Sequence, residues 1–231
     1  MTKPKLLLTG AAGRIGRAIS PALEERWDVA ATDLPGTGLA ELDVTDLAAC
    51  RQACAGMDAV VHMAGVPDPN ADWDALLPAN VVGTHHIARA AMDRGVRRLV
   101  LASSAQAVAG YPPGRQLRAE DRVRPPNLYG ATKAWAEAIG SWAASSSDTT
   151  VVVLRIGFFA ERPPKGADAT PRNMAAWLSH RDAARLVVAA VEADNVRYFV
   201  ANGISANRYQ HLDLTTTRNT IGYAPLDDAW A

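Results

Sequence analysis

Short apolar runs alternate with amphipathic segments along most of the chain. The runs that are too short for helices, and that predict strands, are residues 6–8, 29–33, 57–63, 99–102, 150–157 and 198–201. Apolar residues at helical spacing begin near Arg14 and recur over residues 46–55, 80–94, 129–144 and 179–193. Strands that alternate with helices in this way predict an α/β fold, a doubly wound parallel sheet with helices on both faces.

The composition fits one domain with a small appendage. The chain has 231 residues, and its 24 lysines and arginines balance 24 aspartates and glutamates. No long block of like charge is present, which argues against nucleic acid or an anionic membrane as a partner. We therefore expect a single domain over residues 1–231 that binds a small molecule, with substrate-lobe segments near residues 105–127, 158–180 and 202–231.

Neither a membrane span nor a metal site is expected. No apolar run approaches the roughly twenty residues that cross a bilayer, and the first residues lack a signal-peptide pattern, so a cytoplasmic protein is expected. Cys50 and Cys54 lack a nearby histidine, and their spacing is typical neither of zinc sites nor of redox pairs. We interpret both thiols as packing residues. His180 and Asp182 could bind a metal or act as an acid-base pair. We instead interpret this stretch as a helix start that Ser179 caps.

A glycine-rich turn follows the first strand. Gly10, Gly13 and Gly16 allow close approach to the backbone at a helix start, where free N–H groups and the helix dipole favour a phosphate. About twenty residues later Asp33 ends the second strand, where a carboxylate accepts hydrogen bonds from an adenosine ribose. These features predict a dinucleotide site, the alternative being an ordinary strand, turn and helix with a surface aspartate. The charge of Asp33 favours NAD over NADP, although Arg14 offers the extra phosphate of NADP a partner.

Other candidate residues follow later strands. Ala64 and Gly65 form a small-residue loop where the backbone can approach the second ribose of a cofactor. Asp43 is expected either beside the adenine or as a plain residue at the end of a strand. Ser103 and Ser104 follow a further strand. Ligands of doubly wound sheets bind beyond the carboxyl ends of the strands, which is where all these residues fall.

Tyr129 and Lys133 are four residues apart in a predicted helix and therefore share one face. A tyrosine has too high a pKa to act as a base near neutral pH unless a positive charge, here Lys133, stabilises the phenolate. The phenolate then takes the proton of a substrate hydroxyl while hydride leaves the same carbon for a nicotinamide, and Ser104 hydrogen-bonds the oxygen. On spacing alone the alternative is an exposed helix without a function. The glycine turn, Asp33 and the serine pair favour the catalytic interpretation.

In these motifs the chain resembles the extended short-chain dehydrogenases, the NAD-dependent epimerase/dehydratase family. The matching residues are 9–16 (Thr-Gly-Ala-Ala-Gly-Arg-Ile-Gly), Asp33, 62–65 (His-Met-Ala-Gly), Asn80, 102–104 (Ala-Ser-Ser), 129–133 (Tyr-Gly-Ala-Thr-Lys) and 154–157 (Leu-Arg-Ile-Gly). The resemblance implies a Rossmann fold with a small C-terminal substrate-binding lobe, and Ser104, Tyr129 and Lys133 as catalytic residues. The expected cofactor-binding residues are Gly10, Ala12, Gly13, Arg14, Ile15, Gly16, Asp33, Asp43, Val44, Ala64, Gly65, Asn80, Tyr129, Lys133 and Ile156.

Within that family the chain is most similar to uronate dehydrogenases, which oxidise C1 of a hexuronic acid to a lactone with NAD. Arg172 falls where that group binds the substrate carboxylate, and a guanidinium fork suits a carboxylate. Ala105-Gln106, Phe158 and Pro67 replace polar substrate contacts of the group, which makes the pocket more apolar. The expected substrate-binding residues are Ser104, Ala105, Gln106, Tyr129, Phe158 and Arg172. For Arg172 the alternative is a plain surface residue.

The leading hypothesis is an NAD-dependent dehydrogenase that acts on a sugar or sugar acid. One alternative is a nucleotide-sugar epimerase or dehydratase, which needs a larger lobe than the roughly seventy residues after the last core strand. Another is a non-catalytic NAD-binding sensor, against which the complete serine, tyrosine and lysine set argues. The helices at residues 80–94 and 129–144 carry broad apolar stripes and resemble the dimer interface of family members, so a homodimer is expected unless these stripes only cover the sheet.

Overall fold

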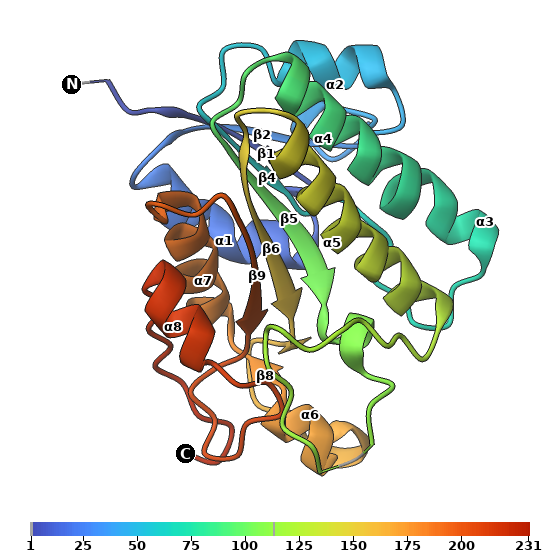
Figure 1. Ribbon diagram of the computed structural model, residues 1–231, viewed down its shortest axis with the longest axis vertical. Coiled ribbons are helices and arrows are strands. Elements are labelled where there is room, and N and C mark those ends of the chain that lie inside the picture. The colour runs from blue at the N-terminus through green and yellow to red at the C-terminus, as the bar shows by residue number, and fades with distance from the viewer. Residues whose placement is uncertain (1, 113) are drawn as a thin grey trace.

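Parallel strands form one central sheet. The computed structural model describes residues 2–112 and 114–231, and within them the seven-stranded sheet has the order β3-β2-β1-β4-β5-β6-β9 (Figure 1). These strands are β1 (Lys5–Thr9), β2 (Asp28–Asp33), β3 (Ala40–Glu41), β4 (Ala59–His62), β5 (Arg98–Ser104), β6 (Thr150–Ile156) and β9 (Tyr198–Gly203). The chain order reverses between β1 and β4, and a doubly wound sheet has its ligand site at such a reversal. The fold predicted from the alternation of strands and helices is confirmed.

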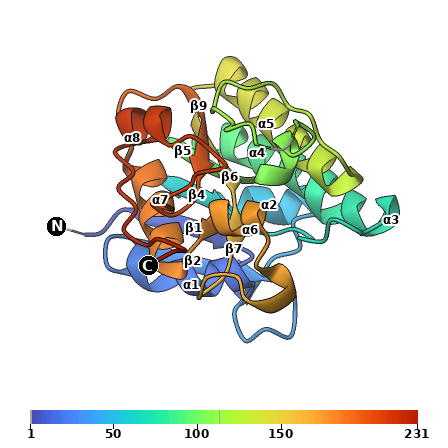
Figure 2. The same ribbon diagram turned by 90° about the horizontal axis from the view of Figure 1, so that it is seen from below.

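Successive side chains of each strand point into two hydrophobic layers. Leu6 and Leu8 of β1 belong to one buried cluster and Leu7 to the other, which explains why the strand is apolar throughout. The helices that cover the first cluster are α1 (Arg14–Glu24), α7 (His180–Glu192) and α8 (Thr215–Ile221), and those that cover the second are α2 (Leu47–Ala53), α4 (Thr84–Asp93) and α5 (Leu128–Ser146). Figure 2 shows the two helix layers on opposite sides of the sheet.

Smaller elements lie beyond the carboxyl ends of the strands or lead into helices. They are α3 (Trp73–Leu76), the π-helix η1 (Leu77–Gly83), the 3₁₀ turns η2 (Ala105–Val108) and η3 (Gly166–Asp168), α6 (Pro171–Ala175), and the paired strands β7 (Phe158–Phe159) and β8 (Trp177–Leu178). Leu117 and Leu212 form an isolated parallel bridge, which joins two of the segments expected to form the substrate lobe. Position 113 of the first segment lies outside the described residues. That the whole chain is one domain stays a prediction.

The helix expected over residues 80–94 begins earlier in the structure. The carboxylate of Asp72 accepts a hydrogen bond from Ala75 N (3.0 Å), and α3 then continues through the π-helix into α4. Pro78 lies at the start of the π-helix, where its missing N–H and its ring are tolerated because the regular α-helical bonding is already interrupted. Among the helices of residues 2–112 and 114–231, none is long and apolar enough to cross a membrane.

A buried ion pair joins the sheet to α5. Arg155 of β6 and Glu137 of α5 make two contacts, from Nε to Oε1 at 2.8 Å and from Nη2 to Oε2 at 2.9 Å. Ser103 Oγ donates to the same carboxylate (2.9 Å), and the Arg155 guanidinium also donates to the carbonyls of Ala119 (3.1 Å) and Asp121 (3.1 Å). Both charged groups are therefore well hydrogen-bonded, as burial of a charge requires.

Replacing Glu137 with alanine leaves the Arg155 guanidinium buried without a counter-charge. We expect Glu137→Ala to lower the free energy of unfolding by about 3–5 kcal/mol, measured by urea denaturation followed through tryptophan fluorescence. The control is Glu192→Ala, which removes the exposed pair of Glu192 with Arg26 (2.7 Å) and should cost at most about 1 kcal/mol. Similar losses in the two variants would contradict a structural role for the buried pair.

Candidate functional site

A cavity of about 550 Å³ opens at the carboxyl edge of the sheet, around the ends of β1, β5 and β6. The predicted site residues that line it are Gly10, Gly13, Arg14, Ile15, Gly16, Gly65, Ser104, Ala105, Gln106, Tyr129, Lys133, Ile156, Phe158 and Arg172. The predicted cofactor residues outside its lining are Ala12, Asp33, Asp43, Val44, Ala64 and Asn80. The structure thus brings together every residue expected to contact the substrate and most of those expected to contact a cofactor.

The glycine turn leaves no room for side chains. Gly10 has a φ of +70°, and a Cβ there would lie 2.5 Å from the backbone N of Ala64. A Cβ on Gly16 would lie 2.3 Å from the carbonyl oxygen of Gly10. Helix α1 starts directly after Gly13 without a side-chain cap and without an acidic residue in its first turn. Its first N–H groups are therefore available to an anion, and the turn fits a pyrophosphate.

Asp33 and Asp43 lie in different surroundings. The carboxylate of Asp33 accepts hydrogen bonds from the backbone N–H groups of Ala12 (2.8 Å) and Leu34 (2.8 Å), which holds it beside the glycine turn with lone pairs to spare for a ribose. One oxygen of Asp43 instead accepts both from Thr45 N (2.8 Å) and from Thr45 Oγ1 (2.7 Å). These bonds lower the pKa of Asp43, and they give its carboxylate a local role in the turn before α2.

Asn80 is buried and connects the loop after β4 to helix α5. Its Oδ1 accepts a hydrogen bond from Val66 N (2.7 Å), and its Nδ2 donates to the Val66 carbonyl (3.1 Å) and to Thr132 Oγ1 (3.2 Å). A Cβ on Gly65 would lie 2.9 Å from Oδ1 of this asparagine. Asn80 therefore positions the backbone that lines the cavity. A direct contact of Asn80 with a cofactor stays a prediction.

Ser104, Tyr129 and Lys133 meet at the floor of the cavity. Ser104 ends β5, and its hydroxyl accepts a hydrogen bond from Gln106 N (3.2 Å). Asn127 caps α5 by accepting from Gly130 N (2.7 Å), which fixes the first turn of the helix that carries Tyr129. The Lys133 ammonium lies 5.6 Å from the centroid of the Tyr129 ring and donates to the Ala102 carbonyl (3.2 Å).

Burial shifts the pKa values of Tyr129 and Lys133 in opposite directions. Burial raises the pKa of the Tyr129 phenol, while a hydrogen bond with Ser104 and the charge of Arg14 act in the opposite direction. Burial also lowers the pKa of Lys133 to about 8. That the charge of Lys133 lowers the pKa of Tyr129 stays a prediction.

The far side of the cavity combines aromatic rings with one cationic side chain. Phe158 and Phe159 line it, and the Phe159 ring also stacks on His180 at 4.6 Å between centroids. The Arg172 guanidinium lines the cavity and donates to the Ala109 carbonyl (3.0 Å). This position is compatible with the expected contact to a substrate acid, which stays a prediction.

His211 also lines the cavity, and the sequence patterns did not identify it. Its Nε2 atom is buried and has no hydrogen-bond partner among residues 2–112 and 114–231. Burial and the charge of Arg172 lower the pKa of the imidazole, so it is neutral near pH 7. A neutral histidine can donate one hydrogen bond to a ligand. The chain around His211 lacks helical or strand periodicity, which is why pattern analysis missed it.

Several residues interpreted as structural have that role. Ser179 Oγ accepts from Asp182 N (3.0 Å) and caps α7, and the Asp182 carboxylate binds the backbone N–H groups of Leu226 (2.8 Å) and Asp227 (2.9 Å). The two cysteines are free and buried. Within the described ranges no group of three or more histidine, cysteine, aspartate or glutamate side chains is placed to hold a metal ion.

Comparison with known proteins agrees with this geometry. The model of the NAD dependent epimerase/dehydratase family matches residues 6–160. The chain is 35% identical to the NAD-dependent glucose-6-phosphate dehydrogenase of Haloferax volcanii, covering 97% of this chain and 94% of that protein. It is 33% identical to the L-arabinose 1-dehydrogenase (NAD(P)(+)) of the same organism, covering 97% of each. The crystal structure of uronate dehydrogenase from Agrobacterium tumefaciens matches with a TM-score of 0.87 at 28% identity, covering 100% of this chain and 87% of that one.

The buried lysine makes stability depend on pH in a definite direction. Its lowered pKa means that the unfolded chain binds more protons than the folded chain between pH 8 and the ordinary value of 10.5, so the wild-type protein gains stability as pH rises through this window. We expect the stability of Lys133→Met relative to wild type to be greatest at or below pH 8 and to decline above it. Urea denaturation of both proteins from pH 7 to 10 measures the difference, and a constant difference would contradict the expectation.

Proposed function

Because the chain belongs to the NAD dependent epimerase/dehydratase family, we propose that it is an NAD-dependent dehydrogenase that oxidises the C1 hydroxyl of a sugar or sugar acid to a lactone. The observation that carries this proposal is the convergence of Ser104, Tyr129 and Lys133 in one cavity, with the glycine turn on one side and Arg172 on the other. The three relatives described above, a glucose-6-phosphate, an arabinose and a uronate dehydrogenase, support it.

NAD, when bound, supplies the acceptor for the hydride that leaves C1. The turn from Gly10 to Gly16 would hold its pyrophosphate against the start of α1, and Asp33 would accept hydrogen bonds from the adenosine ribose. Lys133 and the loop at Gly65, which line the same cavity, would hold the second ribose. NAD is favoured over NADP because the Asp33 carboxylate repels an additional phosphate at that ribose.

Tyr129 and Ser104 have different roles in the removal of the substrate proton. Tyr129 Oη takes the proton of the C1 hydroxyl, and Ser104 Oγ hydrogen-bonds the same oxygen as it becomes a carbonyl. The pKa of Tyr129 is raised by burial, so the enzyme needs nearby positive charge to use this phenol as a base. Lys133 is the cation on the same helix face and Arg14 is the cation across the cavity. Burial of all three catalytic side chains keeps bulk water from competing for these hydrogen bonds.

We infer further that the substrate carries an anionic group at the end remote from C1. Arg172 offers a fork for a carboxylate or phosphate. His211, whose Nε2 has no hydrogen-bond partner in the described part of the chain, adds a neutral donor beside it. Phe158 and Phe159 supply the apolar surface on which a sugar ring can lie. The similarity to an arabinose dehydrogenase makes a neutral pentose the competing substrate. A homodimer and a cytoplasmic location remain predictions from the sequence.

Tyr129→Phe tests the proposed reaction. Removing the hydroxyl should lower kcat by roughly 10²- to 10⁴-fold, because the proton of the substrate then lacks its acceptor. NADH binding, followed by fluorescence, should remain. The matched control is Tyr209→Phe, since Tyr209 is 64% exposed and does not line the proposed site. NAD reduction over a panel of hexuronates, aldoses and sugar phosphates gives the rates, and an unchanged rate in Tyr129→Phe would remove the mechanism.

Arg172→Gln tests the anionic substrate. Loss of a charge-assisted hydrogen bond should raise KM for hexuronates or sugar phosphates by about 10- to 100-fold, and KM for a neutral aldose should stay within about twofold. Arg162→Gln changes an exposed arginine of the same lobe and serves as the control. If Arg172→Gln affects neutral and anionic sugars equally, Arg172 shapes the pocket without recognising the acid.

A further inference from the structure

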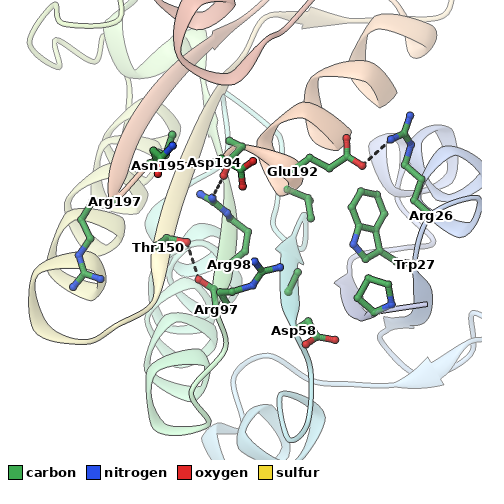
Figure 3. A pocket seen from close by; sticks show the side chains of 15 residues that line it. Arg26, Trp27, Asp58, Arg97, Arg98, Thr150, Glu192, Asp194, Asn195 and Arg197 are labelled. Atoms are coloured by element: carbon green, nitrogen blue, oxygen red, sulfur yellow. Dashed lines mark hydrogen bonds and ion pairs between the residues drawn. The ribbon is translucent and has the colours of Figure 1, made fainter. Parts of the chain in front are cut away.

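A second cavity, of about 590 Å³, lies at the opposite edge of the sheet, where β4, β5 and β6 begin and α7 ends (Figure 3). Strand β5 connects the two regions, because Arg98 is its first residue and Ser104 its last. Six steps along an extended strand span about 20 Å. The second cavity is therefore separate from the proposed sugar site and shares none of the residues that line it.

Arg98 is an exceptional residue of this cavity. Its side chain is only 7% exposed, and among residues 2–112 and 114–231 no carboxylate lies within ion-pair distance of it. Nη2 donates to the Ala193 carbonyl, as the dashed line in Figure 3 marks, but Nη1 is buried and has no hydrogen-bond partner within that part of the chain. A buried guanidinium normally has a counter-charge and a partner for every donor.

Arg97 adds a second positive charge beside Arg98. It also lines the cavity, is exposed, and acts with burial to lower the pKa of Arg98. Asp194 is the one acidic group that opposes this shift. Arg97 and Arg98 are thus two adjacent cations that repel each other, and an anion bound between them would relieve this repulsion.

The other charged groups of the cavity already have partners. Glu192 pairs with Arg26 (2.7 Å), and the Asp58 carboxylate accepts from Lys5 N (2.7 Å). Arg197 donates to the Ser147 carbonyl and so has a hydrogen-bond acceptor outside the cavity. These contacts leave the guanidinium groups of Arg97 and Arg98 as the donors free to bind a ligand.

We propose that this cavity binds a small oxyanion, a phosphate or a phosphate ester, between the guanidinium groups of Arg97 and Arg98. Forked guanidinium donors match the oxygens of a phosphate, and their positive charge attracts it. The cavity is larger than a phosphate ion, and Trp27 and Pro4 give it an apolar wall against which the organic part of an ester can pack. The site is independent of the proposed dehydrogenase reaction.

The test is calorimetric titration of inorganic phosphate into the NAD-saturated protein, with sodium chloride at matched ionic strength as the reference. Saturation with NAD keeps phosphate from the glycine turn, and Arg172→Gln removes the anion contact in the sugar pocket. In the Arg172→Gln background we expect one phosphate per chain, and further substitution by Arg97→Gln or Arg98→Met should weaken its binding by about 10- to 100-fold. Arg218→Gln, an exposed change on α8, should leave the affinity unaltered.

Arg97→Gln keeps the test informative if Arg98→Met fails to fold, because Arg97 is exposed. Repeating the titration with glycerol 3-phosphate distinguishes inorganic phosphate from a phosphate ester as the ligand. Tighter binding of glycerol 3-phosphate identifies the ester. Absence of phosphate binding in the Arg172→Gln protein, or equal binding with and without Arg97, would overturn the proposal. Neither outcome bears on the effect of Tyr129→Phe on sugar oxidation, so the two proposals fail separately.

Discussion

The buried contact between Arg155 and Glu137 is the constraint on which the geometry of the proposed catalytic residues depends. Tyr129, Lys133 and Glu137 follow one another at four-residue spacing and share one face of α5, so a fixed Glu137 also fixes the height and rotation of the two residues before it. Ser103 ties the same carboxylate to β5, and the neighbouring Ser104 therefore meets Tyr129 in a defined position. Burying a charge is costly, but here a single arrangement satisfies both partners, and alternative helix registers would leave a guanidinium unpaired.

Much of the fold and of the site could be predicted because it depends on local sequence. A strand covered on both faces must be apolar throughout, so the short apolar run at residues 6–8 predicts a buried strand. The turn at residue 10 requires a positive φ and has no room for a side chain. Glycine meets both requirements, so the residue type alone indicates the turn. Ser103 and Ser104 are adjacent, chemically identical and both line the cavity, yet the Ser103 hydroxyl donates to Glu137 whereas the Ser104 hydroxyl accepts from Gln106 N. Only resemblance to a family separated the two in advance.

Other features depend on contacts between distant segments and could not be predicted. His211 reaches the cavity at the carboxyl edge because its backbone is held by Ala175 and Leu117, residues far from it in the chain. The pKa of Tyr129 illustrates the same limit, because spacing identifies Lys133 as a neighbour but does not give the depth of burial, which has the larger effect here. The π-helical start of α4 was missed for a related reason. Pro78 locally disfavours a regular helix. The helical segment nevertheless begins earlier, at the cap formed by Asp72, which lies before the apolar pattern starts.

The net charge of the chain does not describe the charge at either edge of the sheet. Acidic and basic residues are equal in number, but a ligand responds mainly to the charges within a few ångströms of it, since distant ones are screened. At the carboxyl edge, Arg172 lines the same cavity as Phe158 and Phe159, and at the amino edge, Arg97 and Arg98 line a cavity together with Asp194. In both places the local balance of charge, and not the net charge of the chain, decides whether an anion is attracted. A chain of zero net charge can therefore offer two candidate anion sites about 20 Å apart, and both depend on the folded arrangement.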